Sequence, residues 1–154
     1  MTIEHDIAFF ERVPTLAELG RAALRILAIG CESRLVHAGE ALFHAGDTAD
    51  SAYVVQEGSF RLETEGDSGM REVIARPGSI LGELAMITPT TRLATAIALE
   101  PSTVIRISRG LFLKMLEGYP ETALRLRDAI AARTDQWVRE MESVKAVLVE
   151  KKGK

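Results

Sequence analysis

Gly82-Glu83-Leu84-Ala85-Met86, followed after residues 87–91 by Arg92-Leu93-Ala94-Thr95-Ala96, is the stretch that decides how this chain folds. It places a glycine, a carboxylate, an arginine and several small residues in one short segment. Backbone N–H groups and a guanidinium bind phosphate well, because the guanidinium meets two phosphate oxygens in a forked geometry. A sugar hydroxyl needs an acceptor such as a carboxylate, and small side chains let the backbone approach closely. The segment therefore suits a ligand that has both a phosphate and a sugar hydroxyl.

The periodicity of apolar residues divides the chain into three parts. Residues 7–29 have apolar positions at three- and four-residue spacing, which predicts helices with a break at Pro14-Thr15. From about Ser33 to Ser108, short apolar runs alternate with glycine-containing turns, as expected for many short antiparallel strands. Pro89 argues against a central strand in the loop after Met86. Helical spacing then returns, and we expect a long helix to begin near Pro120.

These patterns predict a mainly β domain with flanking helices. The expected fold is an antiparallel β-roll, or jelly-roll-like barrel, with N-terminal helices and a C-terminal helix pair. We expect a single domain over residues 1–154, with helices in 1–32, the roll in 33–108 and helices in 109–154. A chain of 154 residues that is 47% hydrophobic can build one full core.

The 82–96 segment resembles the phosphate-binding cassette of cyclic nucleotide-binding domains. These domains occur in catabolite activator (CRP/FNR-like) proteins, protein kinase A regulatory subunits and cyclic-nucleotide-gated channels. GELAM followed by RLAT is similar to the family's Gly-Glu run, variable loop and arginine. Three further stretches resemble turns and strands of the same fold, so the resemblance covers about residues 7–150: Glu40–Asp47, Ala52–Gly58 and Pro77–Glu83.

The resemblance implies a role for each residue of the cassette. Arg92 is expected to bind the ligand phosphate, and Glu83 to accept a hydrogen bond from the ribose 2′-hydroxyl. The alternative role of Glu83 is to cap the short turn that follows it. Gly82, Leu84 and Ala85 are expected to present backbone N–H groups to the ribose and the phosphate. The expected ligand-binding residues are Gly82, Glu83, Leu84, Ala85, Arg92, Leu93, Ala94 and Trp137.

Two features of the site leave alternatives open. Leu93 stands where cGMP-selective relatives often carry threonine, which favours cAMP as the ligand over cGMP. Trp137 either stacks on the adenine base or lies in a helix seam. The seam would be a stripe of residues at four- and three-residue spacing: Ile130, Thr134, Trp137, Met141, Val144 and Leu148. This stripe would either form a parallel helix dimer with a second copy of the chain or pack on the chain's own roll.

Composition and residue spacing argue against other classes of function. A net charge of −3 with no long basic block does not predict a nucleic-acid partner, and no helix-turn-helix follows the long helix, so we expect no direct DNA binding. No signal peptide or membrane span is found, and a cytoplasmic location is expected. Cys31 alone forms no intrachain disulfide. His5, His37 and His44 are scattered, and no nucleophile–base pair stands out, so we expect no metal site, no catalytic residues and no cofactor.

The sequence therefore predicts a stand-alone regulatory module rather than an enzyme. We expect it to sense a cyclic nucleotide, with cAMP favoured, and to change the position of its C-terminal helix on binding. Its protein partner is unidentified. The alternative is a CRP-like interaction module that is unliganded or binds another nucleotide.

Overall fold

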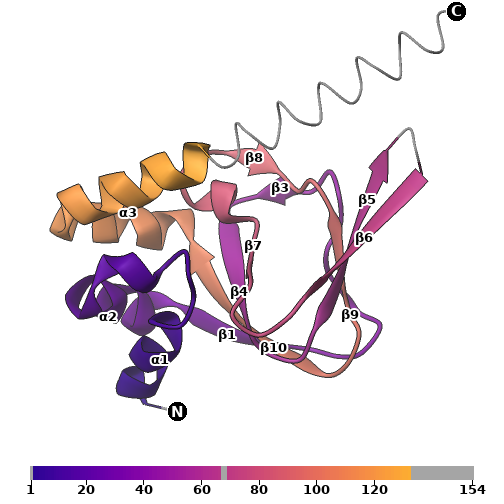
Figure 1. Cartoon of the computed structure of the whole chain (residues 1–154), viewed down its shortest axis with the longest axis horizontal. Coiled ribbons are helices and arrows are strands. Elements are labelled where there is room, and N and C mark those ends of the chain that lie inside the picture. Colours follow the sequence, from indigo (N-terminus) through magenta and orange to yellow (C-terminus); the bar gives the residue numbers. More distant parts are fainter. Residues whose placement is uncertain (1, 67–68, 133–154) are drawn as a thin grey trace, which may run out of the picture.

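The computed structural model describes residues 2–66 and 69–132, which form a β-roll with helices packed on one side (Figure 1). Its strands are β1 (Glu32–Val36), β2 (Ala41–Phe43), β3 (Thr48–Ala49), β4 (Ser51–Glu57), β5 (Phe60–Gly66), β6 (Gly69–Ala75), β7 (Ile80–Leu81), β8 (Thr90–Thr91), β9 (Thr95–Ala98) and β10 (Ser102–Ser108).

The described strands pair in antiparallel fashion in three sheets. Two sheets have four strands each, in the orders β1-β10-β4-β7 and β2-β9-β5-β6, and β3 pairs with β8 in a third. The predicted mainly β, antiparallel architecture with flanking helices is therefore confirmed. The hydrogen bonds among the described strands do not close these sheets into a single barrel.

The helices lie before and after the roll, with one short helix inserted in it. They are α1 (Ile3–Phe10), the 3-10 helix η1 (Ala17–Leu19), α2 (Arg21–Gly30), the 3-10 helix η2 (Glu83–Met86) and α3 (Arg109–Gly118). A further helix begins at Pro120, as expected, and its described part ends at residue 132. No helix in the described part of the chain is both long enough and apolar enough to cross a membrane.

Local sequence explains where two of these helices begin. The Thr2 side chain accepts a hydrogen bond from the backbone N–H of His5, and the Ser108 side chain accepts one from that of Leu111 at 3.1 Å. Side-chain caps of this kind satisfy N–H groups that have no partner inside the helix. The predicted break at Pro14-Thr15 lies between α1 and η1.

Two apolar cores lie on opposite faces of the sheet that contains β4. One core packs the helices against the sheet and includes Phe10, Phe112 and Val54. The other fills the inside of the roll and includes Tyr53 and Val55. Successive side chains of a strand point to opposite faces, so β4 supplies both cores alternately.

The η2 helix connects the cassette to the helical core. Met86 is fully buried in that core, together with Phe112 and Met115 of α3. Ile130, the first residue of the predicted apolar stripe, is also fully buried there. Ile130 therefore packs within this chain, whereas the remaining residues of the stripe lie outside the described residues.

Candidate functional site

A pocket of about 180 Å³ lies at the cassette, between η2 and the neighbouring strands. Its lining includes six of the residues that the sequence assigned to a ligand: Gly82, Leu84, Ala85, Arg92, Leu93 and Ala94. The other lining residues are Phe43, Ala49, Leu62, Ile80, Leu81, Thr90 and Thr91. Most of the lining is apolar, and Arg92 is its charged member.

Arg92 is held at the end of β8 by its backbone and by two aromatic rings. Its N–H donates to the carbonyl of Asp47, and its carbonyl accepts from the N–H of Gly46, both at 2.8 Å. The guanidinium carbon lies 4.4 Å from the ring centre of Phe43 and 5.4 Å from that of Tyr53. Contacts of this kind stabilise a cation by about 0.5–2 kcal/mol. The side chain is thereby fixed with only 7% of the residue exposed.

The guanidinium of Arg92 is incompletely hydrogen-bonded. Nη2 donates to the Ser51 hydroxyl at 3.4 Å, but Nη1 is buried and has no hydrogen-bond partner among the described residues. Burial lowers the pKa of Arg92, whereas the nearby Tyr53 and Asp50 act to raise it. A buried polar group without a partner costs about 1–3 kcal/mol, and more when it is charged. An anionic ligand would supply the missing acceptor.

Gly82 leaves room for the guanidinium of Arg92 because it has no side chain. Its φ of +71° lies in the left-handed region, which side chains other than hydrogen disfavour. A Cβ atom at this position would overlap with Nη1 of Arg92. The glycine is therefore needed both for the turn into η2 and for the approach of the guanidinium.

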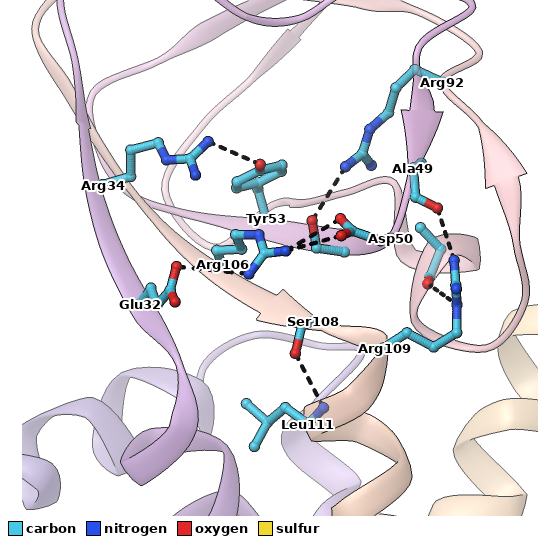
Figure 2. Close-up of polar contacts among 12 residues, drawn as sticks. Glu32, Arg34, Ala49, Asp50, Tyr53, Arg92, Arg106, Ser108, Arg109 and Leu111 are labelled. Atoms are coloured by element: carbon cyan, nitrogen blue, oxygen red, sulfur yellow. Dashed lines mark hydrogen bonds and ion pairs between the residues drawn. The ribbon is translucent and has the colours of Figure 1, made fainter.

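Figure 2 shows the polar contacts near Arg92: its guanidinium with Ser51, and Arg106 with Asp50 and Glu32. Burial acts to raise the pKa of Asp50, but a hydrogen bond from the Ser51 side chain and the charge of Arg106 lower it below its ordinary value. Arg106 Nη2 lies 3.2 and 3.3 Å from the two carboxylate oxygens of Asp50, and Nη1 lies 3.7 Å from Glu32. Because Asp50 is paired with Arg106, the positive charge of Arg92 is only partly compensated.

The carboxylate of Glu83 lies away from this pocket. Its Oε2 accepts a hydrogen bond from the Thr15 hydroxyl at 3.3 Å, and Glu83 is absent from the residues that line the cavity. Gly82 occupies the cap position of η2, with no side-chain hydrogen bond there. The N–H of Ala85 donates to the carbonyl of Gly82 at 3.1 Å, so this predicted ligand donor is already used within the turn. Trp137 lies outside the described residues.

The aromatic contacts of Arg92 were not found from the sequence. Phe43 and Tyr53 come from β2 and β4, far from the cassette in the chain. Arg34 Nη1 also donates to the Tyr53 hydroxyl at 3.1 Å, which fixes the orientation of that ring. Both aromatic residues stand in the strand and turn motifs quoted above, but those motifs indicate fold and do not show which side chains meet.

Other types of functional group are sparse in the described residues. No cluster of three or more His, Cys, Asp or Glu side chains there could hold a metal ion. The Cys31 thiol is half-buried, and desolvation, assisted by Asp6, raises its pKa from 9.0 to about 11. It therefore stays protonated near neutral pH and is a poor nucleophile.

Comparison with known proteins identifies this arrangement. Residues 33–119 match the family model described as the cyclic nucleotide-binding domain. The structure of a cyclic nucleotide-binding-like protein from Brucella abortus is 41% identical, with a TM-score of 0.64, and covers 73% of this chain and 98% of that one. The N-terminal domain of a transcriptional regulator from Streptomyces coelicolor A3(2) is 29% identical, with a TM-score of 0.73, covering 86% of this chain and 94% of that one.

A curated relative is much longer than this chain. The lysophospholipase nte1 of Aspergillus terreus is 32% identical over 100 residues, which are 64% of this chain and 6% of that protein. The similarity thus concerns a small part of the relative. Since the family model spans more than half of the 154 residues, and a solved family structure shares 41% of the aligned sequence, the chain belongs to the cyclic nucleotide-binding domain family.

Proposed function

We propose that this chain is a regulatory module that senses a cyclic nucleotide, with a preference for cAMP, and that Arg92 binds the cyclic phosphate. The observation that supports this most strongly is the buried Nη1 of Arg92, which has no acceptor among the described residues. A cyclic phosphate carries one negative charge and two free oxygens. It would therefore both neutralise the guanidinium and complete its hydrogen bonds.

The rest of the pocket suits the nucleoside. Leu62, Leu84 and Leu93 line it and offer apolar surface to a base and a sugar ring. Leu93 is 51% exposed, and its side chain has no group that could hydrogen-bond to the edge of a base. This supports cAMP over cGMP, because it offers no donor or acceptor for the guanine substituents.

The ribose and the helices are linked in this proposal. Glu83 accepts a hydrogen bond from the ribose 2′-hydroxyl after its carboxylate leaves the Thr15 hydroxyl. Met86, three residues on, is buried against Phe112 and Met115, so a change in the cassette reaches α3 directly. We propose that the ligand shifts the population of cassette conformations and with it the position of the C-terminal helices, through which a partner is regulated.

A second candidate is an interaction module that does not bind a ribose cyclic phosphate. The contact between Glu83 and Thr15 supports it, because this contact removes the expected ribose acceptor from the pocket. The fungal relative is named a lysophospholipase, but the region that it shares with this chain is only 6% of its length. We therefore propose no catalytic role for this chain.

Calorimetric titration with cAMP, cGMP and 2′-deoxy-cAMP tests the proposal. Wild-type protein should bind cAMP most tightly, and Arg92→Gln should weaken binding by ~1.5–3 kcal/mol, roughly ten- to a hundredfold. Arg76→Gln, which removes an exposed charge from the roll, is the matched control and should bind normally. Unchanged affinity in Arg92→Gln would overturn the assignment of Arg92. Absence of heat with all three nucleotides would favour the second candidate.

A further inference from the structure

Arg109, the first residue of α3, donates hydrogen bonds to the backbone of two residues that line the pocket. Its Nε donates to the carbonyl of Ala85 at 3.0 Å, and its Nη2 donates to the carbonyl of Ala49 at 2.8 Å (Figure 2). Ala85 belongs to η2 and Ala49 to β3, and both line the pocket. One guanidinium thus joins two elements that are distant in sequence and face the same ligand site.

The backbone of Arg109 makes a third connection at the same place. Its N–H donates to the carbonyl of Asp50 at 2.8 Å, immediately after Ala49. The start of α3 is therefore hydrogen-bonded to the residue that connects β3 to Ser51 of β4, the hydrogen-bond partner of Arg92. Side chain and backbone together attach the start of α3 to two segments that supply lining residues to the pocket.

The placement of Arg109 is unfavourable for the helix itself. A cation in the first turn is repelled by the positive end of the helix dipole, and α3 has no acidic residue in that turn to offset it. No ion pair to Arg109 is found within residues 2–66 and 69–132; its half-buried guanidinium instead donates hydrogen bonds to the two backbone carbonyls. The benefit of an arginine here is thus tertiary rather than local.

The geometry points to Arg109 as the positioning residue that couples the pocket walls to α3. Its fork holds the Ala85 and Ala49 carbonyls together, because a planar guanidinium can satisfy two acceptors at once in a fixed arrangement. A displacement of η2 or β3 on ligand binding is thereby passed to the first residue of α3. The ligand-dependent part of this inference rests on the proposed function.

Hydrogen–deuterium exchange on the full chain, with and without saturating cAMP, tests this coupling. In the wild-type protein, ligand should slow exchange in both residues 82–94 and residues 109–118. Arg109→Gln should weaken binding about tenfold, and bound ligand should then protect 82–94 without protecting 109–118. Arg109→Lys keeps the charge but not the fork, so it should give intermediate protection, and it serves if the glutamine variant does not fold.

Ser108→Ala is the matched control for this experiment. It removes the cap of α3 and destabilises the helix at the neighbouring position, but it leaves the fork intact. It should retain joint protection of both segments by the ligand. The coupling would be overturned if the ligand still protected both residues 82–94 and residues 109–118 in Arg109→Gln and Arg109→Lys, with an affinity within about twofold of wild type.

Exchange in the absence of ligand separates this inference from the proposed function. Arg109→Gln should speed exchange in residues 83–88 and 109–118 together, whereas Ser108→Ala should speed it in 109–118 alone. If the wild-type protein binds no nucleotide, the proposed function fails while this comparison still tests the fork. Unchanged exchange in 83–88 in the Arg109 variants would then overturn the inference.

Discussion

The Thr15 hydroxyl donates a hydrogen bond to Oε2 of Glu83 at 3.3 Å, although the two residues are 68 positions apart in the chain. The contact ties the segment between α1 and η1 to the first residue of η2. In the proposed function, the ribose 2′-hydroxyl needs the same carboxylate. Thr15 and the ligand are then alternative partners of Glu83, and the N-terminal segment influences affinity.

Thr15→Val should therefore raise the affinity for cAMP. The loss of the competing donor should strengthen binding about two- to fivefold, in line with the modest net contribution of one hydrogen bond. Calorimetry with 2′-deoxy-cAMP should show no such gain, because that ligand does not use Glu83. Thr122→Val, at another half-buried threonine, is the control. An equal gain with both nucleotides would contradict the competition.

Arg92→Met should separate stability from binding. Methionine can fill the space between Phe43 and Tyr53 without leaving a buried cation that lacks an acceptor. The ligand-free protein should become more stable by about 1 kcal/mol, since the desolvation cost exceeds the lost cation–π contacts. Urea unfolding measures the gain, and calorimetry should show loss of cAMP binding. A clear destabilisation of the ligand-free protein would mean that Arg92 is primarily structural.

Gly82→Ala should reduce both stability and binding. The positive φ strains any side chain, and the new Cβ displaces Nη1 of Arg92. We expect a loss of about 1–3 kcal/mol in unfolding free energy, measured by urea titration. Gly78→Ala is the matched control, because Gly78 has a φ of +95° but no atom within 4 Å of the place that its new methyl group would take. Only Gly82→Ala should lose cAMP affinity; equal affinity in both variants would contradict the steric role.

The raised pKa of the Cys31 thiol should make the free energy of unfolding depend on pH in the alkaline range. Desolvation raises the pKa of its thiol from 9.0 to about 11 in the folded chain, so the neutral form is favoured by folding. This contribution to stability is full below pH 9 and is lost as the pH rises from 9 through 11, because the unfolded chain ionises first. Urea unfolding of wild type and Cys31→Ala at pH 8 and 10 should show a steeper loss for wild type. Parallel losses would contradict the shift.

The longer strands could be predicted from sequence because alternation or an apolar run shows in each of them. The strands β3, β7 and β8 have two residues each, and a pair of residues has no period to detect. Thr90 and Thr91 form β8 directly after Pro89, opposite β3. These short strands exist because of their partners, and a single sequence does not reveal those partners.

The cassette could also be predicted from sequence, because its glycine, small residues and arginine are close together in the chain. The surroundings of Arg92 were not, because Phe43, Ser51 and Tyr53 reach it only through the folding of β2 and β4. The partner of Glu83 was also missed. Sequence resemblance assigns that carboxylate to a ligand, but it cannot show that a threonine of the N-terminal segment also reaches it.

The alternation of β4 between the two cores has a consequence for changes in chain length. Ser51–Val55 are buried without interruption, with Val54 on the helix side and Tyr53 and Val55 inside the roll. Insertion of one residue within this strand would exchange the two sets of side chains and bury each in the wrong core. Only Asp50 separates β3 from β4, and its carbonyl accepts a hydrogen bond from the N–H of Arg109, so an insertion there would also shift β4 relative to α3. Changes in chain length are therefore excluded from β4, the strand that supplies side chains to both cores.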